Sequence, residues 1–249
     1  MPFTIAFSGK GGVGKTTLAA LSVKYLLNKG IKPVLTVDAD PNSNLNMTLG
    51  IEFSETIADA REEILDKKVP AGISKTDFIS GRLEELIAEG KGLDLLVMGR
   101  PEGPGCYCAV NNLLREYLGR ISKRYQAVVI DTEAGMEHLS RRTTGDLDVL
   151  FIVANPDPVS ITAASRIQKI AKKLRLKIKN TCFILNRTDN EISGPIRAAI
   201  KESGLNVFAT VPEEKSLKTA SEKGRTILEI PATAAEDKIK IIMDKLIQA

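Results

Sequence analysis

The stretch GKGGVGKTT, which runs from Gly9 to Thr17, decides the fold of this 249-residue chain. It fits the pattern G-x-x-x-x-G-K-[ST] and lies between a short apolar run, residues 4–8, and an amphipathic run, residues 16–28. A strand, a glycine-rich loop and a helix in this order are the context in which the pattern binds phosphate. The glycines let successive backbone N–H groups point at phosphate oxygens, and the helix adds the positive end of its dipole.

Two side chains of this loop have expected roles of their own. Lys15 is expected to reach the β- and γ-phosphates, and the hydroxyl of Thr16 is expected to bind Mg²⁺. The residues expected to surround the phosphates are Gly9, Gly11, Gly12, Val13, Gly14, Lys15, Thr16 and Thr17.

Outward from the loop, short apolar runs alternate with longer amphipathic ones. Several short runs are apolar on both faces, as parallel strands covered by helices on both sides must be. The predicted strands are residues 4–8, 33–38, 93–99, 126–131, 148–154, 181–186 and 206–211. The predicted helices are residues 16–28, 54–66, 76–89, 109–123, 158–174, 193–203, 213–223 and 234–248. The predicted fold class is α/β: one domain, residues 1–249, with a mostly parallel sheet of about seven or eight strands and helices on both faces.

Composition places the chain among ordinary globular proteins, because 43% of its residues are hydrophobic and 27% are charged. The net charge of +4 arises from 35 Lys and Arg against 31 Asp and Glu, mixed along the chain. This mixture indicates a solvated surface and predicts no nucleic-acid partner. The same interpretation applies to a local cluster of cations, with DNA binding as the alternative. The cluster is Lys169, Lys172, Lys173, Arg175, Lys177 and Lys179.

The chain shows no sign of secretion or membrane insertion. Three cysteines are too few and too oddly spaced for a disulfide framework, and MPFTIAFSGKGG is not a signal peptide. No stretch approaches the roughly 20 apolar residues of a membrane span, and residues 234–248 are predicted to be a packed helix. We therefore expect a cytoplasmic protein with free thiols and no membrane partner.

A second lysine, Lys10, lies between the first two glycines of the loop and completes the sequence KGGVGKTT. This sequence resembles the deviant Walker A motif of the MinD, ParA and nitrogenase-iron-protein class of ATPases, and the resemblance extends over essentially the whole chain. In that family the lysine crosses a dimer interface to the partner's nucleotide, which implies an ATP-dependent homodimer. There its charge offsets the negative charge of the transferring phosphoryl group.

The second predicted strand ends in VDADPN, residues 37–42. Carboxylates at the carboxyl end of a strand beside the phosphate loop are placed to meet Mg²⁺ or water. The DxDP pattern resembles switch I of the same family, which implies that Asp40 orients the attacking water and that Asp38 supports the magnesium shell. The alternative is a capped Asp-Pro turn.

The run AVVIDTEAG, residues 127–135, resembles the magnesium-binding strand and switch II of the family. The resemblance implies that Asp131 holds Mg²⁺ through water. It also implies that Gly135 lets the backbone move when the γ-phosphate is lost. His138, which follows this run, is expected to be a surface or interface residue rather than a metal ligand.

Two later strand ends, ILNR at residues 184–187 and VPEE at residues 211–214, resemble the base-recognition segments of the family. The resemblance implies that Asn186 pairs with an adenine edge and that Arg187 stacks on it or caps it. The loop that contains Pro212 and Glu214 would supply backbone groups. Ordinary strand-to-helix turns are the alternative. The NKxD motif of GTPases is absent from the sequence, which favours ATP over GTP.

Two of the three cysteines, Cys106 and Cys108, lie in EGPGCYCAV, residues 102–110. Two thiolates supply half of a tetrahedral sulfur site, and a second chain would complete it on a twofold axis. Thiolates favour soft or borderline ions such as Zn²⁺, Ni²⁺ and Cu⁺. The alternatives are packing in a tight loop, a redox pair, or an iron–sulfur cluster shared by two chains. Cys182 is expected to be a core residue.

The C-x-C pair, taken with KGGVGKTT, DADP and DTEAG, resembles the CooC-type accessory proteins of nickel carbon monoxide dehydrogenase. In that family ATP hydrolysis supports nickel insertion, and the cysteine pair binds metal at the dimer interface. The resemblance implies an ATP-dependent homodimer with Ni²⁺ or Zn²⁺ at Cys106 and Cys108 and a client nickel enzyme. An iron–sulfur-carrying ATPase and a MinD/ParA-type positioning ATPase are the alternatives.

Overall fold

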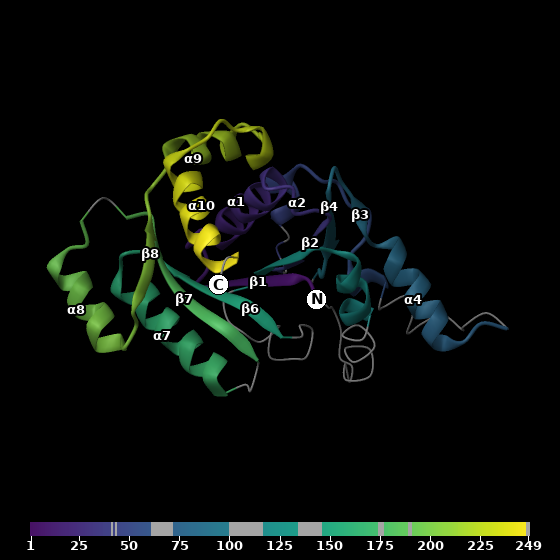
Figure 1. Cartoon of the computed structure of the whole chain (residues 1–249), viewed down its shortest axis with the longest axis horizontal. Helices are drawn as coiled ribbons and strands as arrows, with labels where there is room; N and C mark the ends of the chain where they lie inside the picture. The colour runs from purple at the N-terminus through teal and green to yellow at the C-terminus, as the bar shows by residue number, and fades with distance from the viewer. Residues whose placement is uncertain are drawn as a thin grey trace.

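The centre of the protein is an eight-stranded sheet in the order β3-β4-β2-β5-β1-β6-β7-β8 (Figure 1). The strands are β1 (Phe3–Gly9), β2 (Val34–Ala39), β3 (Ala88–Glu89), β4 (Leu93–Val97), β5 (Ala127–Thr132), β6 (Leu147–Ala154), β7 (Ile178–Asn186) and β8 (Val207–Val211). All neighbouring strands are parallel except β3, which is antiparallel to β4. The structure is a computed structural model that describes residues 1–40, 42, 44–60, 72–99, 117–133, 146–173, 177–188 and 191–247.

Helices cover both faces of this sheet, as the alternating pattern predicts (Figure 1). One face packs against α1 (Lys15–Asn28) and α10 (Ala234–Ile247), with α9 (Lys215–Glu222) and the 3₁₀ turn η2 (Ile227–Glu229) beside them. The other face packs against α4 (Lys75–Glu85), α7 (Pro158–Lys173) and α8 (Gly194–Ser203), and against the segment that ends in η1 (Ser122–Arg124). The predicted α/β class is confirmed.

The central strands are buried on both faces because they carry runs of Val, Ile, Leu and Ala. Every residue of β2 and β5 is buried. Between β1 and β6, Phe7 and Phe151 are register partners whose rings stack with centroids 5.0 Å apart. Because these strands are parallel, their carboxyl ends meet at one edge of the sheet.

The predicted helix over residues 76–89 is wrong at its carboxyl end. Helix α4 ends at Glu85, and Ala88–Glu89 form β3, which turns back onto β4 through Gly90. The N–H of Gly90 donates to the carbonyl of Leu93 at 2.8 Å and closes the tight turn between β3 and β4. A short helix that the sequence did not predict, α2 (Leu45–Leu49), follows β2. The predicted helices 54–66 and 109–123 are described at residues 54–60 and 117–123. Residues 57–60 and 117–121 are helical, residues 54–56 are not, and residues 122–123 belong to η1.

The C-terminal helix is packed into the core, as predicted, and its neighbour is the helix that follows the phosphate loop. The inward residues Ile239, Ile242 and Leu246 of α10 are buried in the core that contains α1. No helix in the described part of the chain is both long and apolar enough to cross a membrane.

Candidate active site

The phosphate loop follows β1, which lies between β5 and β6, and it leaves the sheet at the edge formed by the carboxyl ends of the strands. Gly9 ends β1 and is the register partner of Val153 in β6. A Cβ atom at Gly9 would lie 2.3 Å from the carbonyl oxygen of Val153, so only glycine fits this close approach. The turn into the loop is therefore set by strand packing.

Two more glycines shape the loop, because Gly12 and Gly14 have φ angles of 79° and 93°. Backbone of this kind is disfavoured for residues with a Cβ atom. Helix α1 begins directly afterwards at Lys15, and no side chain caps its N-terminus. The first N–H groups of the helix are thus available for an anionic ligand, which is the arrangement that binds phosphate in proteins.

The loop lysine lies inside this arrangement, since Lys15 is only 5% exposed. Its Nζ donates to the carbonyl oxygen of Lys10 at 3.2 Å. Burial lowers the pKa of Lys15, and the nearby carboxylates of Asp131 and Asp40 oppose this effect. The ammonium group therefore rests on the loop itself, within a cluster of negative charge, where a phosphate oxygen can replace the carbonyl.

Thr16 and Asp131 lie together behind the loop, where the hydroxyl of Thr16 donates to Oδ2 of Asp131. The other oxygen, Oδ1, is buried and has no hydrogen-bond partner among the described residues. Burial raises the pKa of Asp131 to about 7, against the lowering effect of the Thr16 hydroxyl. An unsatisfied buried carboxylate oxygen beside a hydroxyl fits a hard cation such as Mg²⁺, which prefers oxygen ligands and retains several waters.

Asp38 is the register partner of Asp131 on the adjacent strand and is fully buried. Its two carboxylate oxygens accept the N–H groups of Asp40, at 3.1 Å, and of Leu45, at 2.9 Å. Burial raises the pKa of Asp38 to about 6, and Asp40 adds to this effect. The side chain thus holds the loop after β2 and contributes negative charge to the cation site, rather than facing it with free oxygens.

Asp40 follows β2 at the mouth of the site. Its Oδ1 accepts two hydrogen bonds from Asn42, from the backbone N–H at 2.9 Å and from Nδ2 at 3.1 Å. The carboxylate also raises the pKa of Lys15, which places the two groups within electrostatic reach of each other. A carboxylate in this position can orient a water toward the phosphates that Lys15 would bind.

The predicted base-recognition residues line a cavity of about 410 Å³ beside the loop. The cavity lies between the ends of β7 and β8 and the helices α1 and α9, and its lining includes Asn186, Arg187, Pro212 and Glu214. The Glu214 carboxylate accepts hydrogen bonds from the hydroxyl of Ser216 and from the N–H of Ala234. The Glu214 side chain thus joins α9 to the start of α10 at the border of the cavity.

Lys10 is exposed beside a carboxylate that the sequence analysis missed. Asp157 accepts the N–H and the hydroxyl of Ser160, at 2.8 and 2.7 Å, at the start of α7. Burial would raise the pKa of Asp157, but these bonds and the charge of Lys10 outweigh it, so that the pKa is lowered. The helix start was visible in the sequence as Asp-Pro-Val-Ser, but its proximity to Lys10 follows only from the pairing of β1 with β6.

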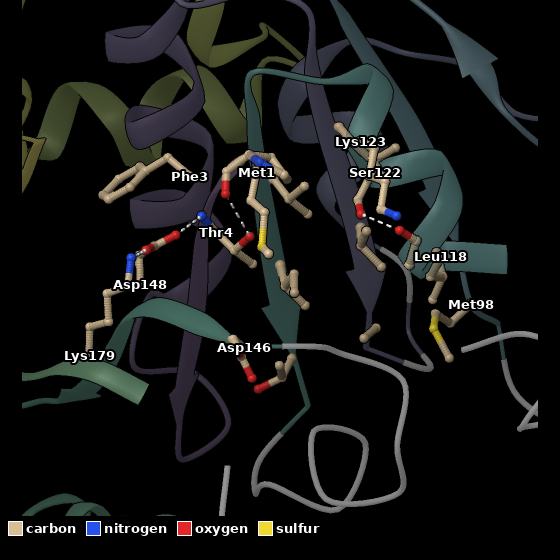
Figure 2. Close-up of a pocket in the computed structure, with 18 residues that line it drawn as sticks. Met1, Phe3, Thr4, Met98, Leu118, Ser122, Lys123, Asp146, Asp148 and Lys179 are labelled. Atoms are coloured by element: carbon tan, nitrogen blue, oxygen red, sulfur yellow. Dashed lines mark hydrogen bonds and ion pairs between the residues drawn. The ribbon is translucent and has the colours of Figure 1, made fainter. Parts of the chain in front are cut away.

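A larger cavity, about 610 Å³, lies on the sheet face formed by β2 and β5, and none of the predicted site residues lines it. Figure 2 shows Asp148 at one side of it, bonded to Lys179 and to the N–H of Thr4, with Met98 and Leu118 at the other. The floor consists mainly of Leu35, Val37, Ala39, Val128 and Ile130. This mostly apolar cavity is therefore separate from the predicted phosphate site.

The cysteine pair Cys106 and Cys108 lies outside the described residues, as do Gly135 and His138. Cys182 lies in β7 and is buried, as predicted. Within the part of the chain that the structure describes, no group of three or more His, Cys, Asp or Glu side chains is arranged to hold a metal ion.

A glycine-rich loop between a central parallel strand and a helix, with a buried lysine, a Thr–Asp pair for Mg²⁺ and an adjacent base-sized cavity, defines a P-loop nucleotide-binding protein. The chain belongs to the CobQ/CobB/MinD/ParA nucleotide binding domain family, whose model matches residues 4–227. It is thus a P-loop ATPase of the MinD/ParA type.

Relatives align with nearly the whole chain. An uncharacterized ATP-binding protein of Methanocaldococcus jannaschii is 42% identical over 248 residues, which cover 98% of each chain. The carbon monoxide dehydrogenase accessory protein CooC of Rhodospirillum rubrum is 29% identical over 267 residues, covering 98% of this chain and 96% of CooC. Among solved structures, the septum site-determining protein MinD of Pyrococcus horikoshii, complexed with Mg-ADP, superposes with a TM-score of 0.67 at 25% identity. That alignment covers 100% of this chain and 99% of MinD. ATP or ADP with Mg²⁺ is the typical ligand of this family.

Proposed function

We propose that this ATPase is a homodimer that binds Ni²⁺ or Zn²⁺ through Cys106 and Cys108 and assists nickel insertion into a carbon monoxide dehydrogenase. The observation that carries the proposal is the pair of cysteines one residue apart in a chain that aligns along its length with CooC. The single histidine of the chain leaves this pair as its main source of soft ligands for nickel.

In the proposed nucleotide cycle, Lys15 binds the β- and γ-phosphates, while Thr16 and Asp131 hold Mg²⁺ directly or through water. The magnesium ion, when bound, neutralises charge on the phosphates and so favours attack at the γ-phosphorus. Asp40 orients the attacking water, and Lys10 reaches the nucleotide of the partner chain. The cavity beside Asn186 accepts the adenine base.

A shared metal site would connect this cycle to cargo. Two chains supply four thiolates, so metal binding and dimerisation favour each other. Structural zinc sites of this composition contribute on the order of 10–16 kcal/mol in small domains, which is ample to hold a dimer. If ATP favours the same dimer, its hydrolysis loosens the site and releases the metal toward the client enzyme.

The test is native mass spectrometry of the full chain under anaerobic conditions, with Ni²⁺ or Zn²⁺ added. We expect one metal ion per two chains in the wild-type protein, and loss of both metal and dimer in a Cys106→Ser/Cys108→Ser variant. Cys182→Ser is the matched control, because it removes a buried thiol of β7 and should leave the metal count unchanged.

Equal metal binding by the wild-type protein and the double variant would overturn the proposal. An iron–sulfur-carrying ATPase is the competing function, since four thiolates also suit a cluster. Visible absorption after anaerobic purification, with iron and sulfide in the same protein, would favour that function over nickel delivery.

A further inference from the structure

The carboxyl end of β7 contacts the phosphate loop through two consecutive side chains. Nδ2 of Asn186 donates to the carbonyl oxygen of Val13 at 2.8 Å, and Nη1 of Arg187 donates to the carbonyl oxygen of Gly12 at 3.0 Å. The two acceptors belong to consecutive peptide groups of the loop. Both residues also line the cavity beside the loop, so they join the base side of the site to the phosphate side.

These hydrogen bonds fix the direction of the loop N–H groups. In a trans peptide group, the carbonyl and the N–H of the next residue point in opposite directions. A bond to the carbonyl of Gly12 therefore orients the N–H of Val13, and a bond to the carbonyl of Val13 orients the N–H of Gly14. Phosphate loops bind their ligand through such N–H groups, so the bonds preorganise the groups that meet the phosphates.

Packing supports the same interpretation. Asn186 is only 6% exposed, and a Cβ atom added to Gly14 would lie 2.4 Å from its Nδ2. Arg187 has a φ of 55°, which is disfavoured for a residue with a Cβ atom. The next residue, Thr188, is held by a bond from its N–H to the carbonyl of Val211 at 3.1 Å. The surroundings thus maintain an unfavourable turn from which both side chains reach the loop.

We propose that Asn186 and Arg187 are positioning residues for phosphate binding, which act on the loop through the carbonyls of Val13 and Gly12 whether or not a base is present. The inference concerns the ATPase site and is independent of the metal function proposed above. It extends the expected role of these residues, which was recognition of adenine alone. A ligand with phosphates and no base separates the two roles.

The experiment measures calorimetric binding of Mg²⁺-tripolyphosphate and of a Mg²⁺-bound non-hydrolysable ATP analogue to the full chain. Asn186→Ala and Arg187→Ala should each weaken tripolyphosphate binding by roughly fivefold, the value of one hydrogen bond, and weaken the analogue at least as much. Arg187→Gln keeps an N–H donor without the charge, so it should recover part of the affinity that Arg187→Ala loses.

Leu217→Ala is the matched control, because Leu217 lines the same cavity on α9, away from the loop carbonyls. It should weaken the ATP analogue and leave tripolyphosphate binding unchanged. The proposal is overturned if Asn186→Ala and Arg187→Ala behave like this control. If Asn186→Ala does not fold, as judged by thermal unfolding without ligand, the two variants at the exposed Arg187 decide the result.

Discussion

Among single residues, Asp40 carries the prediction about the rate of ATP hydrolysis. Its carboxylate accepts a hydrogen bond from the N–H of Asn42 and lies within electrostatic reach of the ammonium group of Lys15. We predict that Asp40→Ala retains ATP binding but lowers the hydrolysis rate by about 10²-fold or more, because a water-orienting carboxylate contributes on this scale. Phosphate release and binding of a fluorescent ATP analogue, measured on the same protein, test this.

The control for this prediction is Asn42→Ala, which removes the hydrogen bond from Nδ2 to Asp40 and keeps both the backbone bond and the carboxylate. Its hydrolysis rate should stay within a few-fold of the wild-type rate. Hydrolysis that survives in Asp40→Ala would assign the attacking water to a different group.

Cys182 allows a prediction about pH. Burial raises the pKa of this thiol to about 11, from an ordinary value of 9.0. At pH 8 its thiolate fraction is therefore about 100-fold below that of an exposed cysteine, and native protein should alkylate at Cys182 far more slowly than denatured protein. Mass spectrometry after a timed iodoacetamide pulse reads this directly.

The same pKa shift predicts how the free energy of unfolding changes with pH. The unfolded chain loses the Cys182 proton near pH 9 while the folded chain keeps it until about pH 11. The stabilisation from this site is therefore complete below pH 9 and declines as pH rises toward 11, by at most about 1.4 kcal/mol per pH unit. Cys182→Ala should remove this part of the pH dependence. Identical pH profiles of the two proteins would contradict the buried thiol.

At the scale of elements, α1, the helix after the phosphate loop, contacts the C-terminal helix α10. Lys24 donates to the carbonyl of Ile230 at 2.7 Å and pairs with Glu236 at 2.8 Å, with both side chains largely buried. Lys24→Met leaves the Glu236 carboxylate without its cation, so we predict a loss of about 3 kcal/mol in the free energy of unfolding. Urea denaturation measures it.

A matched pair on the same two helices provides the control. Lys29 pairs with Asp244 at 2.9 Å, but its side chain is 45% exposed. Lys29→Ala should cost less than about 1 kcal/mol, because water screens exposed ion pairs. If both variants lose a similar amount of unfolding free energy, burial does not determine how much the Lys24–Glu236 pair contributes to stability.

Most elements could be predicted because their patterns are local. The seven longer strands are apolar runs, and they lie within a few residues of their predicted bounds. β3 could not be predicted, since two residues carry no periodicity and their pairing with β4 depends on the turn at Gly90. α2 is also short, with five residues, and the N–H of its first residue is held by the Asp38 carboxylate at the end of β2.

The site divides in the same way. The positions of the loop, Asp131 and Asp40 at or directly after the ends of strands could be predicted, because motif and strand end coincide in the sequence. The contact of Asn186 with Val13 spans 173 positions and could not, because it follows from the order of the strands in the sheet. The proximity of Asp157 to Lys10 has the same origin.

At the scale of the whole molecule, the proposed function makes metal and ATP act on one equilibrium. We predict that a strong chelator shifts the metal-loaded dimer toward monomer even when a non-hydrolysable ATP analogue is present. The reason is that the four-thiolate site would supply much of the association free energy. Sedimentation velocity at several protein concentrations detects the shift.

The Cys106→Ser/Cys108→Ser variant is the control, since its oligomeric state should not respond to the chelator. A dimer that persists in the chelated wild-type protein would mean that the nucleotide alone holds it together.

The two-residue strand β3 has a consequence for solubility. A strand at the border of a sheet offers unpaired backbone groups to any other chain with a free border, which is how many proteins aggregate. The antiparallel turn through Gly90 gives Asp94 and Leu95 of β4 partners from their own chain. An Ala88→Pro variant would lose the backbone N–H of one of the two residues of β3. It should precipitate more readily than the wild-type protein when concentrated, while its nucleotide site stays intact.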